Sequence, residues 1–199
     1  MKIALLSGYI AYAIGFILKI FHVHYNAYIM MAGLLILLIT SVVFILKKES
    51  RSKGLLNLAV FANLLAVLFL AKFYPGADYV TSGAFGLSIG VGYHLLKSRQ
   101  KKGIAGLGLT TAMVALLFLL PNHTKYYSLN IAMNHEIESD MYSLDKYSWF
   151  LYQSGRLQEA VDVSNQAHQI ALETGSEHWQ HTIESHQSEI AAGTWFLYG

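Results

Sequence analysis

The stretch AYIMMAGLLILLITSVVFIL, residues 27–46, holds twenty consecutive positions without a charged side chain. A helix of about 20 apolar residues is long enough to cross the hydrocarbon core of a bilayer, so the stretch predicts a transmembrane helix. A strand of a membrane barrel would instead alternate apolar and polar residues over about 10 positions. The stretch therefore favours an all-α membrane protein.

Four further apolar runs have the same length and character. We predict membrane-spanning helices over 3–22, 27–46, 54–73, 77–96 and 103–120. A cleaved signal peptide is not favoured for the first run, because it carries Lys19, lacks a small-residue cleavage site and is followed by four more runs. The expected fold is a polytopic bundle of five transmembrane helices.

The charges divide the 199-residue chain into two unlike parts. Residues 1–121 hold 11 Lys and Arg against 2 Asp and Glu, whereas residues 122–199 hold 3 against 10. The net charge of +2 is therefore +9 on the first part and −7 on the second. We predict a membrane domain over 1–121 and a small extramembrane helical domain over 122–199. The chain has no cysteine, which excludes disulfides and thiolate chemistry.

Lys and Arg concentrate in two loops, between the second and third helices and between the fourth and fifth. These residues are Lys47, Lys48, Arg51, Lys53, Lys97, Arg99, Lys101 and Lys102. The positive-inside rule places both loops and the N-terminus in the cytoplasm, and five crossings then place 122–199 in the periplasm of a bacterial inner membrane. Topology accounts for these charges, so nucleic-acid binding is not expected.

The first four helices repeat one hairpin, over about residues 8–48 and again over 58–98. The matched positions are Lys19 with Lys72, Ala27 with Ala77, Gly33 with Gly83 and Leu46 with Leu96. Both copies have the same topology, as in parallel membrane repeats.

Lys19 and Lys72 interrupt the apolar runs one turn inside the predicted outer boundary. One interpretation is that their long side chains reach out to the headgroups. The other is that they face the bundle interior and pair with His22 or Asp78, since ionisable groups inside a membrane can mark ion pathways. All four residues are candidates for polar chemistry in the membrane.

Other polar side chains in the spans are expected to hold helices together. Asn57 and Asn63 suit hydrogen bonds between helices. Small residues let helix backbones approach closely, and their spacing here favours packing within one chain over dimerisation. The candidate packing residues are Gly83, Gly86, Gly90 and Gly106.

The first hairpin carries a short pattern of its own. Gly-x3-Lys-Ile-Phe-His at 15–22, followed by Ala27 and Gly33, resembles the N-terminal hairpin of GldL, the membrane motor subunit of gliding motility and type IX secretion in Bacteroidota. The second copy, KFYPGA at 72–77, keeps the Pro-Gly-Ala of that family.

The same resemblance bears on mechanism. The family's proposed motor uses a glutamate in the second helix, and the corresponding positions here are Leu37 and Leu87. The resemblance therefore implies an inner-membrane hairpin architecture with a structural role in an envelope complex, without the motor carboxylate.

The second part returns to helical periodicity after Pro121, with breaks at Gly155 and Gly175. We predict helices over 140–153, 157–172 and 177–198. The first two resemble one tetratricopeptide repeat, with Ala160 and Ala167 small where the helices cross. A plain helical hairpin has the same geometry and remains the alternative.

One such repeat does not bury its own faces, so a protein partner is expected. Aromatic residues crowd this part and suit binding anchors. The candidates are Tyr142, Trp149, Tyr152, Trp179 and Trp195, and the terminal aromatics from Trp195 to Tyr198 also suit a membrane interface.

The sequence offers no enzyme signature. His178, His181 and Glu184 share about a third of a helix circumference, but without a His-Glu-x-x-His pattern or cysteine we expect no metal site. Nucleophile elbows, phosphate loops and dinucleotide fingerprints are absent from the sequence, so we predict no catalytic residue and no cofactor.

These features predict a non-enzymatic inner-membrane scaffold or accessory subunit. It would bind proteins through its periplasmic domain, or assemble into a homo-oligomer through its membrane helices. The alternative is an ion- or proton-conducting motor or transport subunit that uses Lys19, Lys72 and His22.

Overall fold

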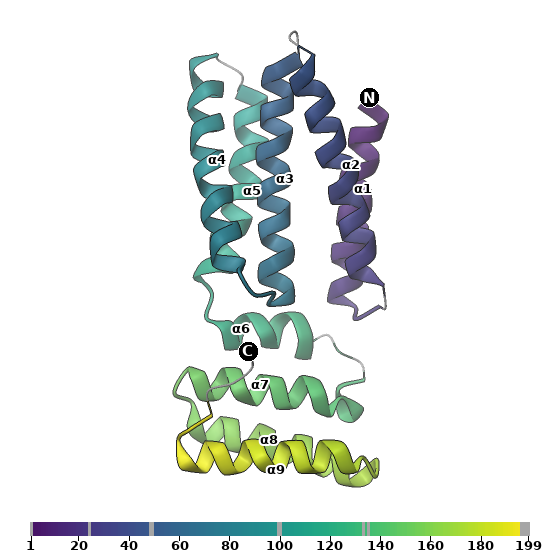
Figure 1. Cartoon of the computed structure of the whole chain (residues 1–199), viewed down its shortest axis with the longest axis vertical. Helices are drawn as coiled ribbons and strands as arrows, with labels where there is room; N and C mark the ends of the chain where they lie inside the picture. The colour runs from purple at the N-terminus through teal and green to yellow at the C-terminus, as the bar shows by residue number, and fades with distance from the viewer. Residues whose placement is uncertain are drawn as a thin grey trace. The chain divides into compact units, whose positions relative to one another are not determined.

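The computed structural model of the chain describes residues 2–23, 25–47, 50–98, 101–132, 134 and 136–195 (Figure 1). Every regular element in these residues is a helix, as predicted. The chain forms two compact units, Met1–Leu120 and Pro121–Gly199.

The first unit is a bundle of five long helices. They are α1 (Lys2–Ile20), α2 (Asn26–Leu46), α3 (Arg51–Lys72), α4 (Ala77–Lys97) and α5 (Lys101–Leu119). Their ends lie within three residues of the predicted ones, because each helix is an apolar run that stops where charges or turn residues begin. Within the bundle α3 contacts α2, α4 and α5 (Figure 1).

Three of these helices, α1, α2 and α3, are long and apolar enough to cross a membrane. A fourth span is reached only if α5 and residues 122–131 are counted together as one broken span. Helix α4 is as long as α2, but its glycines, hydroxyls, Asp78 and His94 dilute its apolar character. The number of spans supported by helix length and composition is thus three or four, fewer than the five predicted.

The interior of the first unit centres on α3. Met30, Leu37, Val67 and Leu95 are each at most 1% exposed within this core. The first hairpin is fastened to α3 by the Tyr12 hydroxyl, which donates a 2.7 Å hydrogen bond to the carbonyl of Leu64.

The second unit is a smaller helical layer. It consists of α6 (Asn122–Tyr126), the π-helical turn η2 (Tyr127–Ile131), the 3-10 turn η3 (Ile137–Ser139), α7 (Met141–Gln153), α8 (Leu157–Glu173) and α9 (Glu177–Ala192). Gly155 and Gly175 make the two tight turns with φ of 77° and 67°, in the left-handed region that glycine enters without strain. Ala160 and Ala167 are fully buried on α8, which contacts both α7 and α9.

The predicted last helix is too long at its C-terminal end. Helix α9 stops at Ala192, because Gly193 adopts a left-handed conformation with φ 70° and ends the helix. The chain then folds back, and the Trp195 ring stacks on the His186 ring with 4.8 Å between centroids. Residues 196–198, the rest of the predicted interfacial aromatics, lie outside the described residues.

Candidate functional site

The two matched lysines of the repeat, Lys19 and Lys72, lie at one end of the bundle. Lys19 is only 4% exposed, inside the protein rather than at its surface. Lys72, the last residue of α3, is half-buried, and α3 ends at the same end of the bundle as α1 (Figure 1). The repeat therefore places its two matched lysines at the same end of the bundle, in the last turns of α1 and α3.

The expected partners of these lysines are arranged differently. His22 lies in the turn after α1, where its backbone N–H bonds to the carbonyl of Lys19 at 3.2 Å. Asp78 is exposed in the first turn of α4, where a carboxylate is favoured by the helix dipole. No salt bridge involving Asp78 occurs among the described residues, so it does not neutralise the lysine pair.

Both turns at this end contain strained backbone. His22, Tyr25 and Phe73 have φ of 56°, 66° and 54°, and they are the non-glycine residues with positive φ in the described ranges. Such conformations cost of order 1–3 kcal/mol each and persist when the surrounding structure enforces them. Phe73 redirects the chain so that the Tyr74 N–H bonds to the carbonyl of Phe69 at 3.0 Å.

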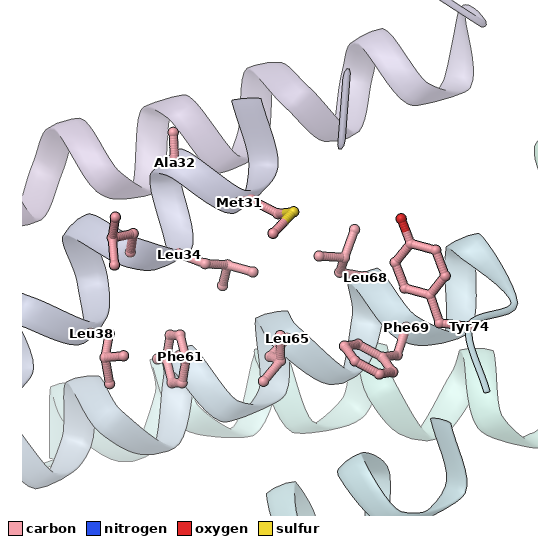
Figure 2. Close-up of a pocket in the computed structure, with 10 residues that line it drawn as sticks. Met31, Ala32, Leu34, Leu38, Phe61, Leu65, Leu68, Phe69 and Tyr74 are labelled. Atoms are coloured by element: carbon pink, nitrogen blue, oxygen red, sulfur yellow. The ribbon is translucent and has the colours of Figure 1, made fainter. Parts of the chain in front are cut away.

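An apolar groove of about 610 Å³ opens between α2 and α3 (Figure 2). At the opposite end of the bundle these helices cross tightly, since a Cβ built on Gly54 would lie only 2.6 Å from the backbone nitrogen of Ile45. The lining side chains come from both helices and from the turn after α3. They are Met31, Ala32, Leu34, Leu35, Leu38, Phe61, Leu65, Leu68, Phe69 and Tyr74.

The groove has one polar side-chain group, the Tyr74 hydroxyl, among its lining residues. The Tyr74 ring packs edge-on against the Phe69 ring with centroids 5.5 Å apart. Figure 2 shows Tyr74 at one end of the groove, with its hydroxyl pointing into the space between the helices. That end is the lysine end, because Tyr74 follows Lys72 by two residues.

The predicted packing glycines do not make close contacts within this chain. No described neighbouring atom lies within 4 Å of a Cβ built on Gly83, Gly86, Gly90 or Gly106. The close packing predicted at these glycines is not seen among the described atoms, and Gly106 instead borders a small pocket with Leu56 and Val60 of α3. The alternative of an oligomer contact stays a prediction.

Close helix contact occurs instead at glycines of the first hairpin. A Cβ built on Gly15 would lie 2.7 Å from the backbone nitrogen of Met30, and one built on Gly33 would lie 2.7 Å from that of Tyr12. A Cβ built on Gly8, in the same interface, would lie 3.0 Å from the Leu37 side chain. Leu37, where the GldL family would carry its glutamate, is thus packed against a glycine and is 1% exposed.

The membrane asparagines do join helices, as predicted. The Asn63 amide donates to the hydroxyls of Thr110 and Thr111 at 3.1 and 3.0 Å, and its oxygen accepts from Ser88 at 3.1 Å. Asn63 is fully buried, so one side chain ties α3 to α4 and α5. Asn57 accepts a longer bond of 3.5 Å from the Tyr9 hydroxyl.

The aromatic candidates of the second unit divide into exposed and buried ones. Tyr142 is 47% exposed, and its ring lies edge-on to Trp179 at 5.6 Å. Trp149 and Tyr152 are half-buried. Trp195 is fully buried by the fold-back after α9, so its assignment as a binding anchor or interfacial residue is corrected.

Histidines in this unit pair with carboxylates. His186 Nδ1 lies 3.0 Å from both carboxylate oxygens of the buried Asp145. His168 Nε2 lies 3.3 Å from Glu184, a partner that the helix α9 pattern alone did not indicate. Within the described residues no group of three histidine or carboxylate side chains is arranged to hold a metal ion.

The groove was missed by sequence reasoning, although one signal for it exists. Phe61, Leu65, Leu68 and Lys72 follow one another at four- and three-residue spacing and so share one face of α3. In the first repeat the matched stripe holds glycines at two positions. The replacement of these glycines by Phe61 and Leu68 marks a face that cannot pack in the same close way.

Comparisons of the chain with protein-family models, with curated proteins and with solved structures found no match.

Proposed function

We propose that the protein is a non-enzymatic membrane scaffold, an integral subunit that presents a helical adaptor to a protein partner. The observation that carries the proposal is the exposed Tyr142 of the second unit, packed against the half-buried Trp179. Tyr142 is 47% exposed beside Trp179, and the Lys146 ammonium lies 5.8 Å from the Tyr142 ring centroid. Tyr and Trp are enriched among the residues that anchor protein interfaces.

The small core of the second unit supports the same proposal. Its apolar cluster is built mainly on Leu144, Ile170 and Ile183 with two alanines. A single tetratricopeptide-like repeat gains stability by stacking on a neighbour. A partner that covers Tyr142 and Trp179 would supply that additional burial.

The proposed setting is a bacterial inner membrane crossed five times by α1–α5. The basic loops support a cytoplasmic N-terminus and a periplasmic second unit. The GldL-like pattern at 15–22 supports membership of an envelope complex. Because the natural chain has no cysteine, single-cysteine variants offer a direct test of this topology.

For the topology test, a membrane-impermeant maleimide is applied to bacteria whose outer membrane has been opened. We expect Gln166→Cys, an exposed position of α8, to be labelled and Arg51→Cys to be labelled only after cell lysis. Labelling of both variants, or of Arg51→Cys alone, in cells with an intact inner membrane would contradict the proposed orientation.

For the scaffold test, a photoreactive phenylalanine derivative replaces Tyr142 in the full chain, with the same replacement at exposed Gln166 as the control. We expect one discrete protein adduct from position 142 and much less from position 166. Equal adducts at the two positions, or none at 142, would refute a partner site on this face.

The alternative function, ion conduction through Lys19, Lys72 and His22, has weaker support. Two neighbouring ammonium groups would repel a cation that enters between them. Replacing both lysines by methionine and measuring flux in liposomes tests it. Flux in the natural chain that the double variant abolishes would favour conduction over the scaffold.

A further inference from the structure

The groove between α2 and α3 has the size and lining of a ligand site. Its volume of about 610 Å³ falls in the ~300–1,000 Å³ range of small-molecule pockets. On α3 it extends from Phe61 to Phe69, which is roughly 12 Å along the helix at 1.5 Å per residue. A long, narrow and apolar space parallel to a membrane helix suits a hydrocarbon chain.

The helix framework holds the groove open. The close crossing at Gly54 joins α2 and α3 at one end, while Tyr12 fastens α1 to α3 by its bond to Leu64. Since α1 is also packed tightly on α2 at Gly15 and Gly33, α2 is held in place from its other side. Phe61 and Leu68 then project from α3 toward α2 without filling the space (Figure 2).

Charge is concentrated at one end of the groove. Lys72 lies one turn beyond Leu68 on the face of α3 that lines the groove. Lys19 lies near enough to add its positive charge there, and the Tyr74 hydroxyl is at the same end. Lys72 makes no salt bridge with a carboxylate in the part of the chain that the structure describes.

We propose that this groove binds an anionic phospholipid from the surrounding bilayer. One acyl chain lies between α2 and α3, and the lipid phosphate is held at the end of the groove by Lys72, with Lys19 behind it and the Tyr74 hydroxyl as a hydrogen-bond donor. The charge complementarity favours an anionic lipid over a zwitterionic one, whose own ammonium group offsets its phosphate. The proposal rests on the membrane setting of the proposed function but not on the scaffold role.

The test uses the full chain reconstituted in vesicles that contain a photoreactive acyl chain on either phosphatidylglycerol or phosphatidylcholine. After illumination, adducts are mapped by mass spectrometry of proteolytic fragments. We expect adducts at the groove, in the segments that contain Met31, Leu35 and Leu65. Adducts from phosphatidylglycerol should exceed those from phosphatidylcholine by about fivefold, the effect of one lysine near an anionic headgroup.

Two kinds of variant separate the charge from the groove. Lys72→Met should bring the labelling by the two lipids close to equal. The control Lys97→Met, at the exposed last residue of α4, should preserve the preference for phosphatidylglycerol. Leu35→Trp should fill the groove and reduce labelling by both lipids. Leu35 is 58% exposed, so the larger ring is tolerated, and Leu109→Trp at a 72% exposed position of α5 is the matched control.

Several results would overturn the proposal. These are equal labelling of the natural chain by both lipids, adducts spread evenly over α4 and α5, or the same loss of preference in Lys97→Met as in Lys72→Met. A groove occupied by a second copy of the chain would appear as protein dimers without lipid adducts, and it too would refute a lipid site.

Flotation of the same vesicles keeps the two proposals apart. Protein that floats with the vesicles but shows no groove adduct refutes the lipid site and leaves the membrane setting intact. Protein that does not float with the vesicles refutes the membrane setting itself.

Discussion

The two repeated hairpins share a sequence pattern and a topology, yet they pack in opposite ways. In the α1–α2 hairpin, Gly15 and Gly33 bring the helix backbones together, so that an added Cβ would clash with backbone atoms at 2.7 Å. In the α3–α4 hairpin, the matched positions are Leu68 and Gly83, and a Cβ on Gly83 would meet no described neighbour within 4 Å.

The difference shows how a duplicated element acquires a new surface. With Lys19 aligned to Lys72, Gly8 and Gly15 correspond to Phe61 and Leu68. The side chains of Phe61 and Leu68 point toward α2 and do not pack closely against α4. They form part of one wall of the apolar groove. Large side chains on one helix face of the second hairpin thus accompany an open contact, whereas glycines at the matched positions of the first accompany a closed one.

The largest expected effect comes from the matched glycines. Gly33→Ala should lower the free energy of unfolding by about 2 kcal/mol, because the added methyl group is forced against the backbone of Tyr12. Gly83→Ala should be neutral or raise it by up to about 1 kcal/mol, through better helix propensity alone. Unfolding in detergent micelles followed by circular dichroism measures both. Equal destabilisation by the two variants would mean that the hairpins pack alike.

A smaller effect tests the side-chain hydrogen bonds that join the second hairpin to its neighbours, since this hairpin lacks the close glycine contacts of the first. Asn63→Ala removes three hydrogen bonds to Ser88, Thr110 and Thr111, which at about 0.6 kcal/mol each amounts to roughly 2 kcal/mol at most. Partial rescue by water should leave about half of that loss. The control, Asn57→Ala, removes one long bond and should change stability by only a few tenths of a kcal/mol.

The same micelle experiment decides this prediction. If Asn57→Ala were as damaging as Asn63→Ala, the buried cluster around Asn63 would have no special part in joining α3 to α4 and α5.

The smallest effect distinguishes the two matched lysines. Lys19→Met should raise the free energy of unfolding by somewhat less than 1 kcal/mol, because it removes a buried charge near a second positive charge. Lys72→Met should raise it less, since Lys72 is only half-buried. A fall in stability for Lys19→Met would show that the buried ammonium is a net stabilising group.

Much of the helical architecture is predictable from the sequence, for a simple physical reason. Apolar runs bounded by charges specify where α1–α5 begin and end, and Gly155 and Gly175 mark the turns of the second unit. The bonding role of Asn63 was also predictable, since an amide in an apolar span needs a partner.

Which face of a helix packs was not predictable in the same way. Helix α4 is rich in glycine and looked suited to close contact, but the glycines that pack against a neighbouring backbone include Gly8, Gly15, Gly33 and Gly54. Helical periodicity identifies faces without saying which neighbour each one meets. The groove lies between α2 and α3, and the stripe on α3 marks one wall without showing the space left beside α2.

The burial of Trp195 has a practical consequence for spectroscopy. All three tryptophans, Trp149, Trp179 and Trp195, belong to the second unit, and the first unit has none. Intrinsic indole emission therefore reports on the second unit alone, and Trp195, enclosed by His186 and Tyr152, is its most sensitive probe of unfolding. Far-ultraviolet dichroism sums both units, so the two signals recorded together resolve whether the units melt independently. The natural tryptophans thus serve as fluorescent probes of the second unit and leave the first unit without one.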